Sequence, residues 1–161
     1  MQGKHLATVI QIVSGGQTGA DRAALDWAIQ QGIAHGGWCP RGRRADEAAP
    51  IDMRYHLRET PSDEYAQRTE WNVRDSDGTV IFTYASALTG GSALTLQLAQ
   101  QYQKPALHIH QACEHPADLL LTFLRQHNIH ILNIAGPRAA SEPDIGPFVI
   151  AVLDQALQRI A

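Results

Sequence analysis

The sequence predicts a single α/β domain, in which helices cover both faces of a parallel sheet, and three observations support this prediction. The chain has 161 residues, a length that suits one domain with a substantial core. Short β-branched segments alternate along it with longer segments of helical periodicity. Such alternation builds a parallel sheet, because each helix crosses over the sheet between two strands. No repeat, low-complexity tract or domain boundary interrupts the pattern, so we expect one Rossmann-like domain over residues 1–161.

The composition is that of an ordinary globular protein and excludes several function classes. Hydrophobic residues make up 44% of the chain and charged residues 18%. The formal net charge of −3 provides no overall field that would attract nucleic acid. No apolar run approaches the roughly 20 residues that span a bilayer, and residues 1–5 lack an export signal. Cys39 and Cys113 form no disulfide framework. We therefore expect a cytoplasmic protein without a nucleic-acid or membrane partner.

The first two elements flank a glycine-rich turn. Residues 7–13 are short and β-branched, which predicts a buried strand. Apolar residues then recur at helical spacing over residues 21–31, and Gly32 closes this helix. Residues 35–50 are rich in glycine, proline and arginine, and irregular sequence continues to about residue 61. A long ordered loop of this kind is usually functional.

The remaining elements alternate regularly. Ser62 is a suitable N-cap for a helix over residues 63–75. Further strands are expected at residues 78–84, 105–110 and 129–134, and further helices at residues 92–103, 117–127 and 145–160.

Three glycine-bearing turns follow predicted strands, at residues 14–21, 89–92 and 135–141. In open parallel sheets, ligands bind outside the carboxyl ends of the strands, where backbone N–H groups and helix N-termini favour anions. One such turn is often only architecture. Three on one sheet edge, with hydroxyls or an arginine beside them, favour a binding edge. The pattern is neither a Walker A motif nor a complete Gly-x-Gly-x-x-Gly.

Charged residues near these turns have two interpretations each. Asp21 opens a helix and is stabilised there by the helix dipole, or it faces a ribose hydroxyl or a metal. Arg22 is a surface residue or a phosphate contact. The arginines at residues 41–44 close over an anion or form a solvated cluster.

The helix predicted at residues 63–75 is unusually polar. Arg68, Asn72 and Asp75 lie at successive turns and form a stripe that we expect to face the site in part. Pairing of Glu70 with Arg74 on the helix surface is the structural alternative. Glu70 and Asp75 are also the candidate catalytic carboxylates.

A histidine cluster is a further place to look for a metal site. His108 and His110 share one face of a strand, with Cys113 and His115 close by in sequence. The cluster lacks a Cys-x-x-Cys pair or a His-Glu-x-x-His spacing, so no metal site is predicted.

Five long stretches occur in collinear order: SGGQTGADRAALDWAI, HGGWCPRGRRADE, YAQRTEWNVRDSDGTVIF, LTGGSALTLQLA and LNIAGPR. Together they resemble the molybdenum carrier family, also described as circularly permuted YpsA-like proteins of the SLOG superfamily. The resemblance covers residues 9–160 and implies a Rossmann-like fold whose glycine turns bind a nucleotide or nucleotide-derived ligand. It also implies a molybdenum-cofactor or molybdate cargo, bound through phosphate or oxo groups, and a homo-oligomer, either a dimer or a tetramer.

Related LOG-type phosphoribohydrolases carry the motif Pro-Gly-Gly-x-Gly-Thr-x-x-Glu. The similar stretch here begins at Thr89 and retains Gly90 and Gly91, which the resemblance implies contact phosphate. Gln97 stands where that motif has its glutamate, so a carboxylate that would assist N-glycosidic cleavage is missing.

The sequence therefore favours a binding protein for a small anionic ligand, such as a nucleotide or the molybdenum cofactor. A nucleotide N-glycosidic hydrolase and a scaffold without a ligand are the alternatives. The expected ligand contacts are Ser14, Gly15, Gly16, Gln17, Thr18, Gly19, Asp21, Arg22, Arg43, Arg44, Arg68, Asn72, Thr89, Gly90, Gly91, Ser92, Gly136 and Arg138.

Overall fold

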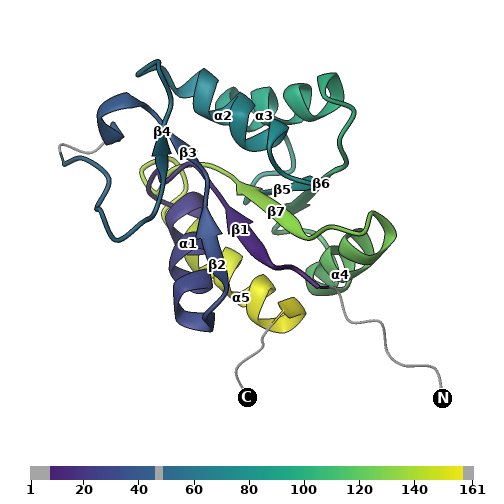
Figure 1. Ribbon diagram of the computed structural model, residues 1–161. Helices are drawn as coiled ribbons and strands as arrows, with labels where there is room; N and C mark the ends of the chain where they lie inside the picture. The colour runs from purple at the N-terminus through teal and green to yellow at the C-terminus, as the bar shows by residue number, and fades with distance from the viewer. Residues whose placement is uncertain (1–7, 46–48, 158–161) are drawn as a thin grey trace.

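The computed structural model describes residues 8–45 and 49–157 and confirms the α/β fold, with one parallel sheet between two layers of helices (Figure 1). The sheet has five strands in the order β2-β1-β7-β5-β6, and every neighbouring pair is parallel. The strands are β1 (Gln11–Val13), β2 (Ala34–Gly36), β5 (Gly78–Thr83), β6 (Ala106–His110) and β7 (Ile131–Ala135).

The last strand of the chain lies at the centre of the sheet. In β7, Ile131 pairs with Gln11 of β1, and Leu132 pairs with Gly78 of β5. Because all three strands are parallel, their carboxyl ends lie side by side at one edge. The turns that follow β1, β7 and β5 therefore meet there, although they are far apart in sequence.

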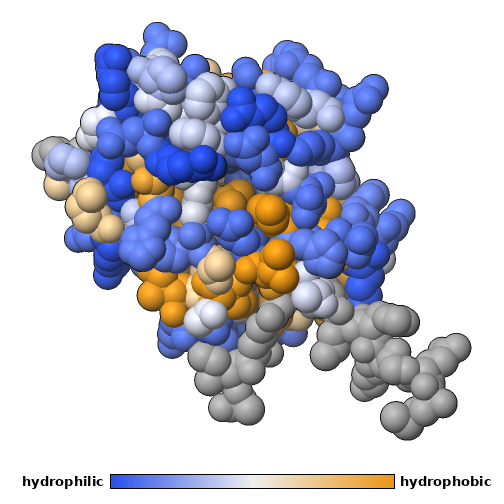
Figure 2. Space-filling view, viewed as in Figure 1, coloured by the Kyte–Doolittle hydropathy of each residue, from blue (hydrophilic) through white to orange (hydrophobic). Residues whose placement is uncertain are grey.

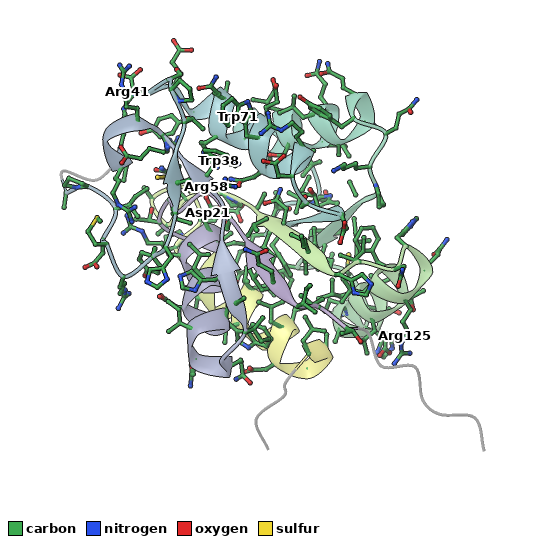
Figure 3. The ribbon with its side chains drawn as sticks, viewed as in Figure 1. Asp21, Trp38, Arg41, Arg58, Trp71 and Arg125 are labelled. Carbon is green, nitrogen blue, oxygen red and sulfur yellow. The ribbon has the colours of Figure 1, made fainter. Side chains whose placement is uncertain are left out.

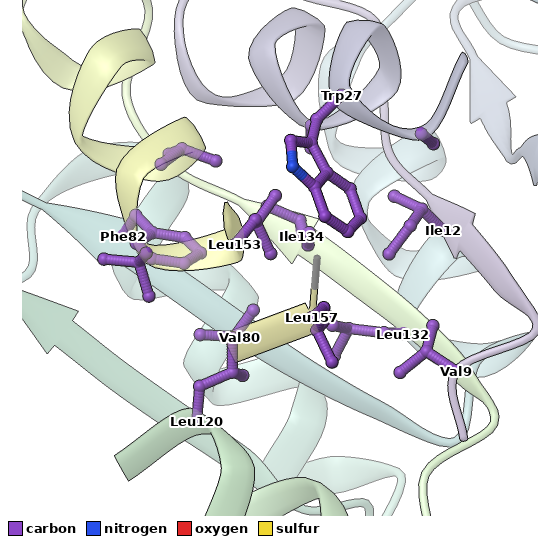
Figure 4. Packing of buried hydrophobic residues seen from close by; sticks show 14 of the residues in the cluster. Val9, Ile12, Trp27, Val80, Phe82, Leu120, Leu132, Ile134, Leu153 and Leu157 are labelled. Atoms are coloured by element: carbon purple, nitrogen blue, oxygen red, sulfur yellow. The ribbon is translucent and has the colours of Figure 1, made fainter. Parts of the chain in front are cut away.

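One face of the sheet carries α1 (Ala20–Gln31), α4 (Pro116–Gln126) and α5 (Ile145–Leu157), which enclose the main core (Figure 4). Alanines on α1 let the helix approach the sheet closely, and Trp27 fills the space between that helix, β7 and α5. The Trp27 Nε1 donates a hydrogen bond to Asp154 at 2.8 Å, which satisfies the one polar atom of this buried ring.

The other face carries α2 (Tyr65–Arg74) and α3 (Gly90–Gln101) over a smaller core of Val73, Leu98 and Ala99. The outer surface of these two helices is mainly hydrophilic, as Figure 2 shows. None of the helices in the described residues combines the length and apolar character needed to cross a membrane.

The segment predicted as irregular contains more structure than expected. It includes β2, a 3₁₀ turn at Arg41–Arg43, and a small parallel pair formed by β3 (Trp38–Cys39) and β4 (Arg58–Glu59). These strands are too short for periodicity to reveal them.

Several predicted boundaries also shift. The first strand begins at Gln11, and position 7 of its predicted range lies outside the described residues. The helix expected after Ser62 begins at Tyr65, because the Ser62 hydroxyl accepts a hydrogen bond from the Glu64 N–H in a preceding turn. The last helix is described as far as Leu157, so residues 158–160 of its predicted range lie outside the described part.

Replacing Gly136 by alanine should destabilise this fold. An added Cβ would lie 2.5 Å from the Phe82 carbonyl oxygen and 2.6 Å from the Ala20 Cβ, so β7, β5 or α1 must move. We expect the free energy of unfolding in urea to fall by about 1–3 kcal/mol, the usual cost of overpacking. Gly91→Ala is the matched control, since no heavy atom of the described residues lies within 4 Å of its added Cβ. Equal losses of unfolding free energy in Gly136→Ala and Gly91→Ala would contradict the packing role given to Gly136.

Candidate functional site

A cavity of ≈ 530 Å³ lies at the carboxyl ends of β1, β7 and β5, where the three glycine turns meet. All three turns contribute to its wall, together with α2. The lining residues are Gln17, Asp21, Arg68, Thr69, Thr83, Ala85, Ala87, Thr89, Gly90, Gly91, Ser92, Thr95, Ala135, Gly136, Pro137, Arg138, Ser141 and Glu142.

The turn after β1 packs directly against the turn after β7. Gly19 has a φ of 87°, and a Cβ there would lie 2.5 Å from the Pro137 carbonyl oxygen. The Ala20 N–H donates to that same oxygen at 3.2 Å, and the Thr18 hydroxyl accepts from the Ala139 N–H at 3.4 Å. Gly19 and Thr18 therefore hold two walls of the cavity together.

Arg68 reaches from α2 into the turn after β1. Its Nη1 would lie 2.4 Å from a Cβ at Gly15, so only glycine leaves room for the guanidinium. The same Nη1 lies 3.5 Å from the Asp21 Oδ2. The Nε of Arg68 is buried and has no hydrogen-bond partner among the described residues.

Asp21 is a buried carboxyl in the first turn of α1, with 3% of its surface exposed (Figure 3). It accepts a hydrogen bond from the Gln17 N–H at 3.3 Å. Burial raises the pKa of Asp21 above its ordinary value of 3.8, and the positive charge of Arg68 opposes this shift. The net direction is upward, so the folded protein favours the neutral carboxyl more than an exposed aspartate would.

The turn after β5 presents the N-terminus of α3 to the cavity. Thr89 precedes this helix and makes no side-chain capping hydrogen bond within the described part of the chain. Gly90 has a φ of 52°, which favours glycine for conformational reasons. Gly91 has no such requirement, and a Cβ on either glycine would meet no described heavy atom within 4 Å. The space in front of α3 is therefore open.

The turn after β7 supplies a second guanidinium. Arg138 lines the cavity, and its Cζ lies 4.6 Å from the centre of the Tyr65 ring. Glu142, further along the same segment, accepts a hydrogen bond from the Tyr84 N–H at 2.6 Å. The cavity wall thus holds two arginines and two carboxylates, each positioned by a neighbouring segment.

The sequence matches the Circularly permutated YpsA SLOG family over residues 12–157. The chain belongs to this family. A crystal structure of a "Putative molybdenum carrier protein" from Syntrophus aciditrophicus SB is 46% identical in sequence. The two superpose with a TM-score of 0.90, over 94% of this chain and 96% of that one. A comparison with curated proteins gives no significant match.

Half of the contacts predicted for this SLOG protein line the cavity, and the others have different positions. Gln17, Asp21, Arg68, Thr89, Gly90, Gly91, Ser92, Gly136 and Arg138 are in its wall. Ser14 instead donates to the Ile134 carbonyl at 2.6 Å, and the Arg22 Nε donates to the Gly16 carbonyl at 2.9 Å. Gly16 leaves room for Leu57, whose Cδ1 would lie 2.7 Å from an added Cβ.

The two predicted loop arginines differ in their surroundings. Arg43 is buried away from the cavity wall and donates to the carbonyls of four residues of the same loop. It therefore organises the loop itself. Arg44 is exposed, with its Cζ 4.8 Å from the Tyr65 ring centre.

The carboxylates proposed for catalysis do not line the cavity. Glu70 accepts a hydrogen bond from the Tyr102 hydroxyl at 2.9 Å, between α2 and α3. Asp75 pairs with Arg74 and accepts from the Trp38 Nε1 at 2.8 Å. Its hydrogen bond with Arg74 lowers the pKa of Asp75. Helical periodicity predicted that the stripe of Arg68, Asn72 and Asp75 would in part face the site. Of these three, only Arg68 lines the cavity, because α2 turns its later residues towards β3 and α3.

Asn72, the remaining member of the stripe, is buried and supports β3. Its side chain accepts from the Trp38 N–H at 2.8 Å and donates to the Trp38 carbonyl at 2.9 Å. The position of the LOG-type glutamate is equally remote, since Gln97 is exposed on α3 and is not part of the cavity wall.

Sequence reasoning missed Tyr65, Thr83, Thr95 and Glu142. Thr83 is the last residue of β5, so its place at a strand end was an available signal. The Thr83 Oγ1 lies 2.6 Å from the His108 Nε2, which links the cavity to the histidine pair. Within the described residues, no three His, Cys, Asp or Glu side chains are grouped to hold a metal ion.

The stability of the protein should depend on pH through Asp21. A carboxyl with a raised pKa contributes most below its unfolded value, and this contribution is lost as the pH rises through the folded pKa. Asp21→Asn keeps a neutral group of the same shape. We expect the wild type to lose stability relative to Asp21→Asn as the pH rises above the ordinary aspartate pKa of 3.8, measured by urea denaturation at a series of pH values. If the wild type instead gains stability relative to Asp21→Asn as the pH rises, the ion pair with Arg68, and not burial, determines the pKa of Asp21.

Proposed function

We propose that the cavity binds a small molecule through a phosphate or a similar oxyanion, and that the protein carries this molecule without transforming it. One observation supports the proposal above all: Gly91 lines the cavity without a packing or conformational need for glycine. Close contacts explain why positions 19 and 136 are glycine, as a purely structural role requires, but no such contact explains the glycine at position 91. A ligand that approaches the backbone closely is a physical reason for a glycine there.

The N-terminus of α3 supplies the attraction for the anion. The first N–H groups of a helix lack partners within the helix, and the dipole places partial positive charge at this end. The α3 helix has 12 residues and directs this end at the cavity through Gly90, Gly91 and Ser92. Arg68 and Arg138, which also line the cavity, add full positive charges. Arginine suits this task because its planar fork matches the oxygens of a phosphate.

The cargo class follows from the cavity and from the named relative. A volume of ≈ 530 Å³ falls in the range of roughly 300–1,000 Å³ that small-molecule sites occupy. The Syntrophus protein is named as a molybdenum carrier. The molybdenum cofactor carries a phosphate, and molybdate is itself an oxyanion, so both suit a cavity with this donor set. A nucleotide also carries a phosphate and would suit the cavity for the same reason. The free thiols of Cys39 and Cys113 agree with a cytoplasmic carrier.

A nucleotide hydrolase is the weaker candidate. Glu70 and Asp75 lie outside the cavity wall, and Gln97 replaces the LOG-type glutamate. Of the two carboxylates in the wall, Glu142 already accepts from the Tyr84 N–H. Burial raises the pKa of Asp21, as is expected of a general acid. Release of free base from AMP that disappears in Asp21→Asn would support this alternative.

Gly91→Asp should abolish binding without harming the fold. An aspartate in the first turn of a helix is stabilised by the dipole, so the free energy of unfolding should not fall. Its charge would occupy the space proposed for the anion. We expect the affinity measured by isothermal titration to fall at least tenfold, for whichever of AMP, ADP-ribose or a molybdopterin extract binds the wild type.

Gly91→Asn is the matched control, because it adds the same volume without charge and should weaken binding less. No heat with any of the three ligands, in a wild type shown to be folded, would overturn the proposed function. Equal effects of the two substitutions would show that size and not charge excludes the ligand.

A further inference from the structure

We propose that the cavity binds its oxyanion together with one proton, which Asp21 takes up as the anion arrives. This inference rests on the proposed function and deepens it, because a proton becomes part of what the cavity binds. The affinity for the anion then depends on pH: the ligand is held tightly at low pH and is released as the pH rises. The burial of Asp21 and its long contact with Arg68 lead to this proposal.

Asp21 belongs to the cavity wall, yet only 3% of its surface is exposed. An ionised carboxylate at this position has lost most of its water, which is costly unless neighbouring groups compensate for the loss. The groups that face Asp21 are Arg68 of α2, Arg138 of the turn after β7, and Gln17 and Ser14 of the turn after β1. Burial raises the pKa of Asp21 by more than these four groups lower it. The surroundings of Asp21 therefore favour a bound proton.

The ion pair between Asp21 and Arg68 is long. The Arg68 Nη1 lies 3.5 Å from the Asp21 Oδ2, whereas a hydrogen bond between two charged groups usually measures about 2.7–2.9 Å. The Arg68 Nε is buried and has no hydrogen-bond partner among the described residues. Arg68 therefore keeps hydrogen-bonding capacity that Asp21 does not use.

An oxyanion in the cavity would compete with an ionised Asp21 for Arg68. Both residues line the same cavity, so an anion that contacts Arg68 lies close to the Asp21 carboxyl. Two negative charges that share a buried site repel each other strongly, and protonation of one of them removes the repulsion. A protonated Asp21 also leaves the whole charge of Arg68 to the ligand. Anion binding should therefore raise the pKa of Asp21 further, so the protein takes up a proton as it binds.

The direction of the pH dependence follows from this coupling. Below the pKa of Asp21 in the free protein, the carboxyl is already neutral and the anion binds with full affinity. Between this pKa and the higher pKa of the complex, each anion brings a proton with it, so the affinity falls as the pH rises. The fall is at most about tenfold per pH unit, because only one proton is involved.

The test is isothermal titration of the full-length protein with sulfate at a series of pH values above 3.8, the ordinary pKa of an aspartate. Sulfate has the shape of phosphate and stays doubly charged over this range, so a change in affinity with pH comes from the protein. We expect the wild-type affinity to fall by at least about threefold per pH unit at its steepest. Titrations in buffers of different ionisation enthalpy give the number of protons taken up, which should reach about half a proton or more at the same pH.

Asp21→Asn carries the shape of the protonated carboxyl at every pH. This variant should bind sulfate within threefold of the wild-type affinity at the lowest pH, keep that affinity as the pH rises, and take up almost no protons. A purely structural role of Asp21 would instead lower the affinity at every pH. Asp26→Asn is the matched control, because it removes the same charge from the same helix, but Asp26 is partly exposed and pairs with Arg54 outside the cavity wall. It should retain the wild-type pH dependence and proton uptake.

NMR of the wild type tests the inference without any substitution. The ¹³C shift of the Asp21 carboxyl, followed through a pH titration, should give a higher pKa with saturating sulfate than without it. An equal or lower pKa in the complex would overturn the inference.

The inference would also be wrong if the wild-type affinity did not fall with pH, or if Asp21→Asn took up as many protons as the wild type. In both cases anion binding and the proposed function would stand. Absence of sulfate binding at every pH would overturn the inference as well, and the titrations with AMP, ADP-ribose and the molybdopterin extract would then decide the proposed function separately.

Discussion

The parallel pairing of β7 with β1 on one side and β5 on the other is the constraint on which the rest of the structure depends. Leu132 takes part in both ladders, opposite Ile12 and Gly78. This pairing inserts the last strand of the chain between strands that come before it and aligns three carboxyl ends. Without it, the three glycine turns would not surround one cavity. The glycines then allow the turns to approach each other within contact distance.

Contacts around the glycines of the turns divide them into three groups. Gly19 and Gly136 face backbone atoms at distances that no side chain could share, so they serve the assembly of the cavity walls. Gly15 makes room for Arg68, which brings a positive charge inside. Gly90 and Gly91 face open space at the start of α3. The first group explains how the cavity walls are assembled, and the last group marks the open space in which the proposed ligand would approach the backbone.

Local sequence patterns predicted the fold because the strands and helices are consistent with their own periodicity. They also predicted that the turns at Ser14, Thr89 and Gly136 follow strands, and the cavity lies at this edge of the sheet. They did not predict which polar residues of α2 face inwards, because β3 and α3 cover Asn72 and Glu70 through contacts distant in sequence. Such contacts depend on the tertiary structure alone.

Tyr65 is the clearest example of a residue whose surroundings local sequence patterns could not predict. No motif marks it, and the three arginines that surround its ring come from different segments. Arg43 and Arg44 are neighbours in an arginine-rich loop, yet Arg43 is buried in the loop and Arg44 lies over the Tyr65 ring. Sequence composition identified the loop as basic. Only the folded chain distinguishes the structural arginine from the binding candidate.

The central claim is that one anion contacts the three turns together, and NMR of the ¹⁵N-labelled protein tests it most directly. Titration with inorganic phosphate should shift the backbone amides of Gln17, Gly91 and Arg138, one from each turn in the cavity wall, in a saturable manner with one common Kd. Shifts confined to the exposed loop arginines, or shifts at the three turns with unrelated affinities, would contradict the account.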